Sequence, residues 1–387
     1  MQLPVYILDL YNREKLQPFS TLNSIATLNF GIYSNLERWE LYLKKQCQII
    51  VPEYLQPRYP IPDFLKNTKE KIYLNANIIP TVDIVEQIIQ LEPETTLIDI
   101  NGFIASRTNL APSLLNVVKN FRMIPEQKRL TLITDLLKYQ AELINEDFKL
   151  LSQQIKTQAV PAYCAASGID SIIIEEDSYI NPCFLNAQTG PIIIRKGAEI
   201  MEGASIRGPI IMQQDSCIKM NSTIYGTVTL GKKSVIGGEV KNSIIMDYSN
   251  KAHHGYLGDS IVGKWCNLGA GVTNSNLKNN GQNVKLHFPG IDTPITVGNK
   301  MGCLIGDYSK LAIEVKINTG TYIGNACNIF NNIELPKMVP DFTWGVHQSY
   351  KFNKLKRDLQ QWASFKKKDI SETEFNIMKH FYHNQNL

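Results

Sequence analysis

Aliphatic residues recur at every sixth position through much of the second half of the chain, and this repeat constrains the fold more than any other feature. Two runs hold an aliphatic residue at each step: Ile194, Ile200, Ile206, Met212, Ile218, Ile224, Leu230 and Ile236, then Ile305, Leu311, Ile317, Ile323 and Ile329. A period of six is neither the 3.6 of a helix nor the 2 of a flat strand. It is typical of a solenoid in which short strands are separated by corners and three strands complete one turn. Stacking such turns buries a continuous apolar column.

Small or β-branched residues, such as Ala198, Ser216 and Cys303, stand two positions before most of these aliphatic residues, where a corner leaves little space. The repeat therefore predicts a parallel β-helix over residues 190–336, although the spacing alone does not determine its hand. Two segments, 242–255 and 274–293, break the period. We expect loops to leave the solenoid there, and loops on a rigid scaffold often carry function.

The N-terminal part of the chain has a different pattern. Residues 1–155 alternate predicted strands (5–8 and 97–100) with predicted helices (28–44, 80–91 and 130–154), which indicates an α/β domain. Residues 156–189 form a connector with short strands that lead into the solenoid. Residues 337–387 form a helical tail, in which a Ser-Glu-Thr-Glu capping box at 371–374 precedes a helix over 375–383.

Composition limits the partners that this chain of 387 residues can have. A net charge of +4 is too small to indicate nucleic acid, and no run of about 18 apolar residues predicts a membrane helix. The seven cysteines include no CxxC pair, which argues against a zinc site or a disulfide framework and fits a reducing cytoplasm. The first residues are too polar for a signal peptide. We expect a cytoplasmic protein with no membrane or nucleic-acid partner and no bound metal.

A motif with chemical content follows the first break in the repeat. Residues 251–259 read KAHHGYLGD and residues 267–271 read NLGAG. Together they resemble the signature of the bifunctional N-acetylglucosamine-1-phosphate uridyltransferase and glucosamine-1-phosphate acetyltransferase family. The segments 185–191, 202–209, 237–243, 274–280 and 318–321 support the resemblance, which covers nearly the whole chain, is strong only after about residue 170, and is closest to a divergent bacterial branch described as sugar nucleotidyltransferases. The resemblance implies an N-terminal nucleotidyltransferase domain, a left-handed β-helix and a homotrimer with active sites between neighbouring copies.

The resemblance also implies acetyl-CoA as acyl donor and the amine of an amino-sugar phosphate, such as glucosamine 1-phosphate, as acceptor. Transfer to an amine needs a base with a pKa near neutrality, which favours histidine. His253 aligns with the base of the family when YLGD is matched, and His254 is the base in the neighbouring register and otherwise contacts substrate. The same resemblance gives further roles: Lys251 binds the sugar phosphate, Tyr256, Asn267 and Asn276 bind the sugar, and the amides near Ala270 and Gly271 bind the acyl group or coenzyme. Simpler explanations remain, namely a surface histidine pair beside a lysine and asparagines that fill corners or stack in ladders.

The N-terminal domain departs from the nucleotidyltransferase pattern. Active members hold a nucleotide triphosphate with a glycine-rich loop and arginine, because bare amides wrap phosphates. Here no glycine occurs before Gly31, Arg13 remains as the expected substrate contact, and Leu22-Asn23-Ser24 stands where the branch has Thr-Arg-Pro. Asp99 is either a remnant metal ligand or an ordinary residue at a strand end. We expect a degenerate domain, which would need Mg²⁺ only if it were active.

Three functions therefore stay open. The histidine loop favours an amino-sugar-phosphate acyltransferase with His253 as general base. The fold-level likeness of residues 1–155 is the only support for a sugar-1-phosphate nucleotidyltransferase that transfers a uridylyl or thymidylyl group. The missing nucleotide-binding residues favour a non-catalytic, sugar-nucleotide-binding or assembly homologue.

Overall fold

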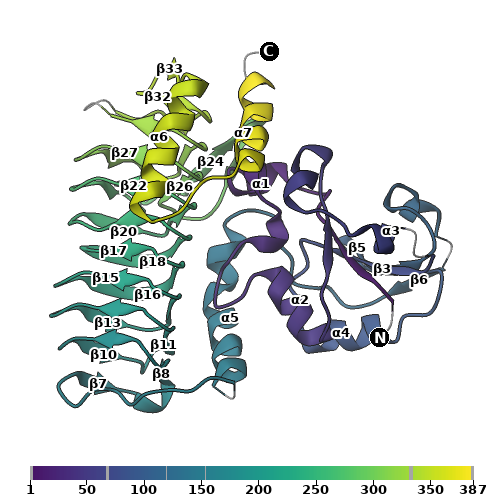
Figure 1. The fold of residues 1–387 in the computed structure, drawn as a ribbon, viewed down its shortest axis with the longest axis horizontal. Helices are drawn as coiled ribbons and strands as arrows, with labels where there is room; N and C mark the ends of the chain where they lie inside the picture. Colours follow the sequence, from purple (N-terminus) through teal and green to yellow (C-terminus); the bar gives the residue numbers. More distant parts are fainter. Residues whose placement is uncertain (1–2, 67–68, 119, 153, 331–333, 385–387) are drawn as a thin grey trace. The chain divides into compact units, whose positions relative to one another are not determined.

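The computed structural model describes residues 3–66, 69–118, 120–152, 154–330 and 334–384, and the chain forms two compact units (Figure 1). The first unit comprises residues 1–28, 33–135 and 372–381, and the second comprises 29–32, 136–371 and 382–387. Helix α5 (Asp135–Leu151), which the sequence-based division placed in the N-terminal domain, thus belongs almost entirely to the second unit. Its contacts give the reason, since Gln140 Nε2 donates to Thr227 O over 2.7 Å.

A mixed six-stranded sheet of order β2-β1-β3-β5-β4-β6 forms the centre of the first unit. Its strands are β1 (Val5–Leu8), β2 (Gln48–Ile50), β3 (Lys71–Asn75), β4 (Thr95–Asp99), β5 (Gly102–Thr108) and β6 (Asn120–Met123). Strand β1 is parallel to β2 and β3, whereas β5 is antiparallel to both of its neighbours. The chain passes from β2 across β1 to β3, so the carboxyl ends of these strands form a topological switch point, where open α/β sheets bind ligands.

The helices of the first unit are short. They are α1 (Phe19–Leu22), α2 (Asn35–Leu43), α3 (Asp63–Lys66), α4 (Val82–Ile89) and the 3₁₀ helices η1 (Glu14–Leu16), η2 (Ile25–Thr27), η3 (Glu53–Arg58) and η4 (Pro112–Val117). The predicted helix over 28–44 is wrong in its first part. Helix α2 begins only after Ser34, which forms a capping box with Glu37, and the apolar residues before it are buried in irregular chain.

The first ten residues of α7 (Glu372–Asn384) also belong to the first unit, although they lie near the end of the chain. The helix begins where the capping box predicted a start. Phe375 and Met378 are buried, Glu374 forms an ion pair with Arg58 (3.4 Å), and His380 stacks on Tyr54 at 5.1 Å between ring centroids.

The second unit is a parallel β-solenoid, which appears in Figure 1 as a ladder of short strands. Its strands are β7 (Ala165–Ser167), β8 (Ile172–Ile174), β9 (Tyr179–Ile180), β10 (Phe184–Asn186), β11 (Ile192–Ile194), β12 (Glu199–Ile200), β13 (Ser205–Arg207), β14 (Ile210–Met212), β15 (Cys217–Ile218), β16 (Thr223–Leu230), β17 (Val235–Ile236), β18 (Glu239–Ile245), β19 (Asn250–Lys251), β20 (Tyr256–Gly258), β21 (Ile261–Val262), β22 (Asn267–Leu268), β23 (Thr273–Asn274), β26 (Cys303–Ile305), β27 (Lys310–Leu311), β28 (Lys316–Ile317), β29 (Thr321–Ile323), β30 (Asn328–Ile329), β31 (Met338–Val339), β32 (Thr343–Trp344) and β33 (Gln348–Ser349). The 3₁₀ helix η5 (Ile169–Ser171) lies in the first turn. The architecture expected from the sequence, an N-terminal α/β domain followed by a parallel β-helix and C-terminal helices, is confirmed.

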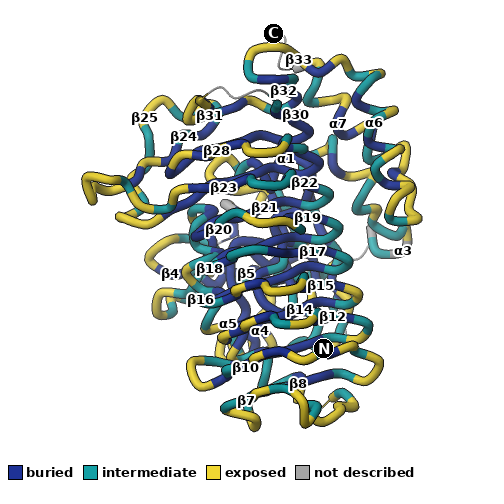
Figure 2. The backbone as a smooth tube through the Cα atoms, turned by 90° about the vertical axis from the view of Figure 1, so that its left-hand side faces the viewer, coloured by how far each residue is buried: buried dark blue, intermediate teal, exposed yellow. Residues whose placement is uncertain are grey.

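The residues of the six-residue repeat fill the inside of the solenoid. Ile200, Ile218, Ile236, Leu268 and Ile329 are each at most 1% exposed and belong to one continuous apolar cluster. In Figure 2 buried chain recurs in successive turns from β8 up to β30. Burial of one such side chain contributes about 1.5–3 kcal/mol, so the column is the main source of stability in this unit.

The two breaks in the repeat have different structures. Over 242–255 no loop leaves the solenoid, and the expectation of one was wrong. Val235 pairs with Asn250, so this turn has 15 residues where Cys217 pairing with Val235 gives 18. The second break, 274–293, does leave the solenoid and contains most of an antiparallel hairpin of β24 (Lys285–Phe288) and β25 (Ile291–Thr296), which projects to the side in Figure 2.

Two sheets of the solenoid are packed against other parts of the same unit. The outward residues Ile193 and Ile211 are fully buried on the surface along which α5 and residues 29–32 lie (Figure 1), where Gln213 donates to Ile32 O (2.7 Å). Helix α6 (Phe352–Phe365) covers the sheet that contains β22 and β27. The remaining surface, formed by β7, β10, β13, β20 and the first halves of β16 and β18, is called here the β20 face.

Candidate active site

The two histidines of the motif lie at the corner between β19 and β20, and both side chains are exposed. This corner joins the sheet that carries Asn250 and Asn267 to the β20 face, which carries Tyr256. The structure therefore presents an accessible pair of imidazoles at an edge between two surfaces of the solenoid.

Tyr256 and Asn276, both predicted to bind sugar, are brought together. Asn276 Nδ2 donates to Tyr256 Oη over 3.0 Å and also to the carboxylate of Asp259. Asn242 Nδ2 donates to the other oxygen of that carboxylate over 2.6 Å. Sequence reasoning assigned no role to Asp259 or Asn242. Their positive φ angles, 49° and 43°, show that both occupy tight corners, which the sequence could have suggested only through the preference of Asp and Asn for such conformations.

A second polar cluster lies in the two turns before Tyr256 on the β20 face. Tyr225 Oη donates to Glu239 Oε1 over 2.6 Å, and Lys241 Nζ lies 5.7 Å from the centre of the Tyr225 ring. Glu239 pairs in register with Tyr256. Burial, with the nearby Asp259 carboxylate next in effect, raises the pKa of Tyr256 to about 12, so its phenol stays neutral and can donate a hydrogen bond. The residue pattern of 237–243 did not predict this cluster, because Tyr225 and Glu239 meet only when the turns stack.

Asn267 does not join Tyr256 within one chain. It lies in β22 on the neighbouring sheet, where Asn250 Nδ2 donates to Asn267 Oδ1 at 3.5 Å and Lys310 is its partner in the next turn. Asn250 Oδ1 also accepts a hydrogen bond from Lys366 at the end of α6 (2.9 Å). The asparagine ladder that the sequence analysis kept as a simpler explanation is present here.

The corner of Ala270 and Gly271 lies directly beside the histidines. Gly271 N donates to His254 O over 3.2 Å, and Ala270 O accepts from Glu314 N over 2.7 Å. The Gly271 amide, expected to bind the acyl group or coenzyme, is thus already engaged in joining one turn to the next.

Lys251 lies in a place that its expected role does not fit. Its side chain is 2% exposed and points into the solenoid from a position paired with Ile236. The Nζ atom donates to Gly237 O (2.9 Å) and to His253 O (2.6 Å). Burial lowers the pKa of the ammonium from 10.5 to about 8. A lysine that holds a sugar phosphate needs an accessible ammonium, and this one lies inside.

In the first unit, both residues considered for nucleotide or metal binding are held by internal contacts. Arg13 forms an ion pair with Asp9 and donates to Ser20 O, Asn23 O and Tyr54 Oη. Asp99 forms an ion pair with Arg129, and its carboxylate also accepts from the amides of Asn101 and Gln127, both over 2.8 Å. Within the described ranges there is no group of three or more His, Cys, Asp or Glu residues placed to hold a metal ion.

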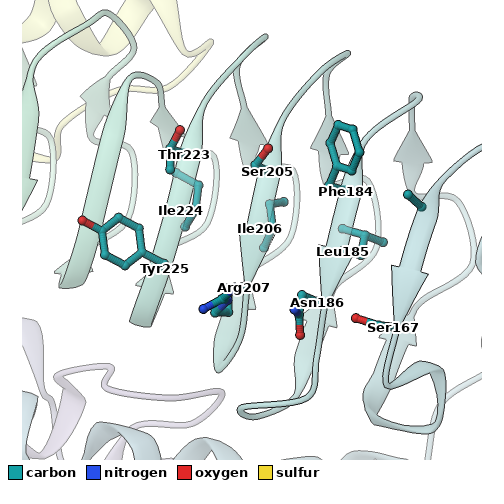
Figure 3. A pocket seen from close by; sticks show the side chains of 11 residues that line it. Ser167, Phe184, Leu185, Asn186, Ser205, Ile206, Arg207, Thr223, Ile224 and Tyr225 are labelled. Atoms are coloured by element: carbon teal, nitrogen blue, oxygen red, sulfur yellow. The ribbon is translucent and has the colours of Figure 1, made fainter.

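A hollow of about 500 Å³ lies on the β20 face, over the early turns of the solenoid (Figure 3). Side chains of β10, β13 and β16 line it, among them Phe184, Arg207 and Tyr225. The hollow does not include the histidine corner. No helix in the described part of the chain is both long enough and apolar enough to span a bilayer.

Both units of the chain can be compared with known proteins, and parts of the chain are similar to nucleotidyltransferases and to bifunctional relatives. Residues 5–156 match the model of a family described as sugar nucleotidyl transferase. A bifunctional protein GlmU from Methanococcus maripaludis is 33% identical over 185 residues, which is 41% of this chain and 44% of the relative. A bifunctional sugar-1-phosphate nucleotidylyltransferase/acetyltransferase from Sulfurisphaera tokodaii is 36% identical over 144 residues, 36% of this chain and 35% of the relative. A GlmU from Synechococcus elongatus is 27% identical over 227 residues, 53% of this chain and 46% of the relative. The chain thus spans less than half the length of these curated relatives.

Proposed function

We propose that the solenoid of this chain transfers an acetyl group from acetyl-CoA to the amine of an amino-sugar phosphate, because residues 5–156 match a sugar nucleotidyl transferase model and relatives named GlmU share parts of the chain. The observation that carries this proposal is the exposed pair of histidines at the corner beside Tyr256, Asn276 and Asp259. The relative from Sulfurisphaera tokodaii, which matches 36% of this chain, is named a nucleotidylyltransferase/acetyltransferase, and this name supports the same reaction class.

The proposed step needs one base and one leaving group. His253 removes a proton from the amine of the sugar as the nitrogen attacks the thioester carbonyl. The new C–N bond forms, the C–S bond breaks, and coenzyme A leaves as a thiolate that takes up a proton. General base catalysis of this kind contributes about 10²- to 10⁴-fold in rate. His254 lies beside it and contacts the substrate, or serves as base in its place.

The β20 face supplies the remaining contacts in this proposal. Tyr256 and Asn276 bind sugar hydroxyls through groups that are already oriented by Asp259. Lys241 replaces Lys251 as the cation for the sugar phosphate, because its ammonium lies on the outer surface beside Tyr225. Glu239, opposite Tyr256 in register, lies where it can attract the sugar amine.

A homotrimer completes the proposed site. Asn267 and Tyr256 lie on different sheets of one chain, and α6 covers the sheet of Asn267. We therefore place the contact between copies at the β20 face, where a neighbouring solenoid can close over Tyr256 and Asn276, and the sugar contact expected of Asn267 stays a prediction. We place the reaction in the cytoplasm, where acetyl-CoA and sugar phosphates are available.

The test is release of free thiol from acetyl-CoA with glucosamine 1-phosphate as acceptor. Wild type, His253→Ala and His254→Ala are compared at pH 7.5. We expect acceptor-dependent release by wild type and a loss of at least 100-fold in kcat for His253→Ala, with a smaller loss for His254→Ala. If kcat instead falls more in His254→Ala than in His253→Ala, His254 is the base. Absence of release by wild type at millimolar acceptor contradicts the function for this substrate pair.

The family match of residues 5–156 favours a second candidate, a sugar-1-phosphate nucleotidyltransferase. That reaction requires Mg²⁺, and the residues present do not fit the ion, because Asp99 is already bound by Arg129 and two backbone amides. We derive no metal-dependent step for this domain. Pyrophosphate release from UTP and N-acetylglucosamine 1-phosphate, measured with and without Mg²⁺, decides whether the domain has kept the activity.

A further inference from the structure

Lys251 occupies a position in the solenoid that equivalent turns fill with aliphatic residues. The register places it between Ile236 in the turn before and Leu268 in the turn after, and the same column continues through Ile218 and Leu311. An isolated ammonium inside an apolar column is costly, and a well-packed apolar side chain is often as stable or more stable in such a place. Packing alone therefore gives no reason for a lysine here.

The hydrogen bonds of Lys251 lead to the histidine corner. Its Nζ donates to Gly237 O in the previous turn and to His253 O in the corner itself. Lys251 O in turn accepts from Gly237 N over 2.7 Å. The turn before is also closely apposed, since a Cβ on Gly237 would collide with Ala252 O. The ammonium thus binds the corner from inside the solenoid.

The direction of the histidine side chains depends on this backbone. In the described part of the chain, neither the His253 nor the His254 imidazole makes a hydrogen bond, so no side-chain partner orients either ring. The backbone of the corner is held at His254 O by Gly271 N, at Gly255 O by Glu239 N and at His253 O by Lys251 Nζ. Of these three anchors, only the lysine is a side chain that mutation can remove.

We propose that Lys251 is a positioning residue for acyl transfer: from inside the solenoid it fixes the backbone of residues 252–255, and this sets the direction of the His253 and His254 imidazoles. The inference rests on the proposed acyltransferase function. It replaces the contact with sugar phosphate that the motif suggested for this lysine.

The discriminating variant is Lys251→Met, because methionine has a similar length, suits the apolar column and cannot donate to His253 O. We expect kcat for thiol release to fall at least tenfold while KM for glucosamine 1-phosphate changes less than threefold. We also expect the temperature of thermal unfolding to stay the same or rise, which separates loss of positioning from loss of fold. Ile218→Met, an apolar exchange two turns earlier in the same column, is the matched control and should keep wild-type kcat.

Hydrogen exchange provides a readout that needs no activity. In Lys251→Met the amides of residues 252–256 should exchange at least tenfold faster than in wild type, while those of β15 and β17 remain unchanged. If the amides of the corner exchange in Lys251→Met as they do in wild type, the proposal is wrong. It is also wrong if these amides exchange faster but kcat for thiol release does not change. If wild type itself releases no thiol, the proposed function and the positioning role fall together, whereas the exchange rates still decide whether Lys251 fixes the corner.

Discussion

At the scale of single residues, the charge of Lys251 links stability to pH. Burial lowers the pKa of its ammonium to about 8, from 10.5 in the unfolded chain. Between these values the unfolded chain holds a proton that the folded chain has released, so the folded state becomes relatively more stable as pH rises. The free-energy cost of the buried charge is therefore fully present below pH 8 and disappears by about pH 10.5.

The direction of this pH dependence of stability gives a prediction for Lys251→Met. Methionine carries no charge at any pH, so the variant should gain stability relative to wild type at pH 7, by at most about 3 kcal/mol and less where the two lost hydrogen bonds offset the gain. The gain should shrink steadily between pH 8 and pH 10.5. Urea unfolding of both proteins across this range measures the difference, in which the titration of all other groups cancels. A difference that is constant with pH would show that the ammonium carries no desolvation cost.

The sequence located the residues of the candidate site but not the directions of their side chains. Counting in sixes from Ile236 never reaches Lys251, because the turn between them has 15 residues. The motif thus indicated an outward, phosphate-binding lysine, and only the register shows that it points inward. Asp259 was quoted within YLGD without a role, because its partners Asn242 and Asn276 lie 17 residues away on either side and meet it only when the turns stack.

At the scale of elements, the apolar column is the feature that the sequence predicted best. Each aliphatic residue meets its equivalents in the turns before and after, as Ile206 does with Ile224. Such a repeated local pattern fits a single structure, so the fold of this region can be predicted without knowing which distant residues are in contact. The helix over 28–44 failed for the opposite reason, because Leu28, Phe30 and Ile32 are buried by distant parts of the chain rather than by a helical face.

The column makes a prediction about stability. Ile224 is 1% exposed. Changing it to Ala should lower the free energy of unfolding by about 2–5 kcal/mol, and changing it to Val should lower it by about 0.5–1.5 kcal/mol. The cause is the cavity that remains between rigid turns. Denaturant unfolding followed by circular dichroism measures both variants. If both substitutions lower the free energy of unfolding by the same small amount, the turns have moved together to fill the cavity.

At the scale of the whole molecule, the proposed trimer depends on the β20 face. This surface carries the hollow of Figure 3 and an exposed aromatic residue, Phe184, which is 58% exposed. The division of the chain into two units could not be predicted in detail from the sequence, because helix α5 follows the α/β domain in the chain but packs on the solenoid through Gln140.

We predict that the protein sediments with three times the chain mass of 43.8 kDa. Phe184→Glu should shift it to monomer, because a charge would then lie in the contact between copies. Ile89→Glu is the matched control, since Ile89 is similarly exposed (51%) but lies in α4 of the first unit, outside the solenoid. Analytical ultracentrifugation distinguishes the species. A monomeric wild type, or equal behaviour of both variants, removes the β20 face as the trimer contact.

The first ten residues of α7 also affect how the protein is made. They complete the first unit through Phe375 and Met378, the Arg58–Glu374 ion pair and the stacking of His380 on Tyr54. These residues leave the ribosome only after those of the solenoid, although the rest of the first unit emerges before it. The N-terminal domain therefore cannot reach its final structure during translation until the solenoid has been made, and premature termination before Glu372 damages the domain that was synthesised earliest.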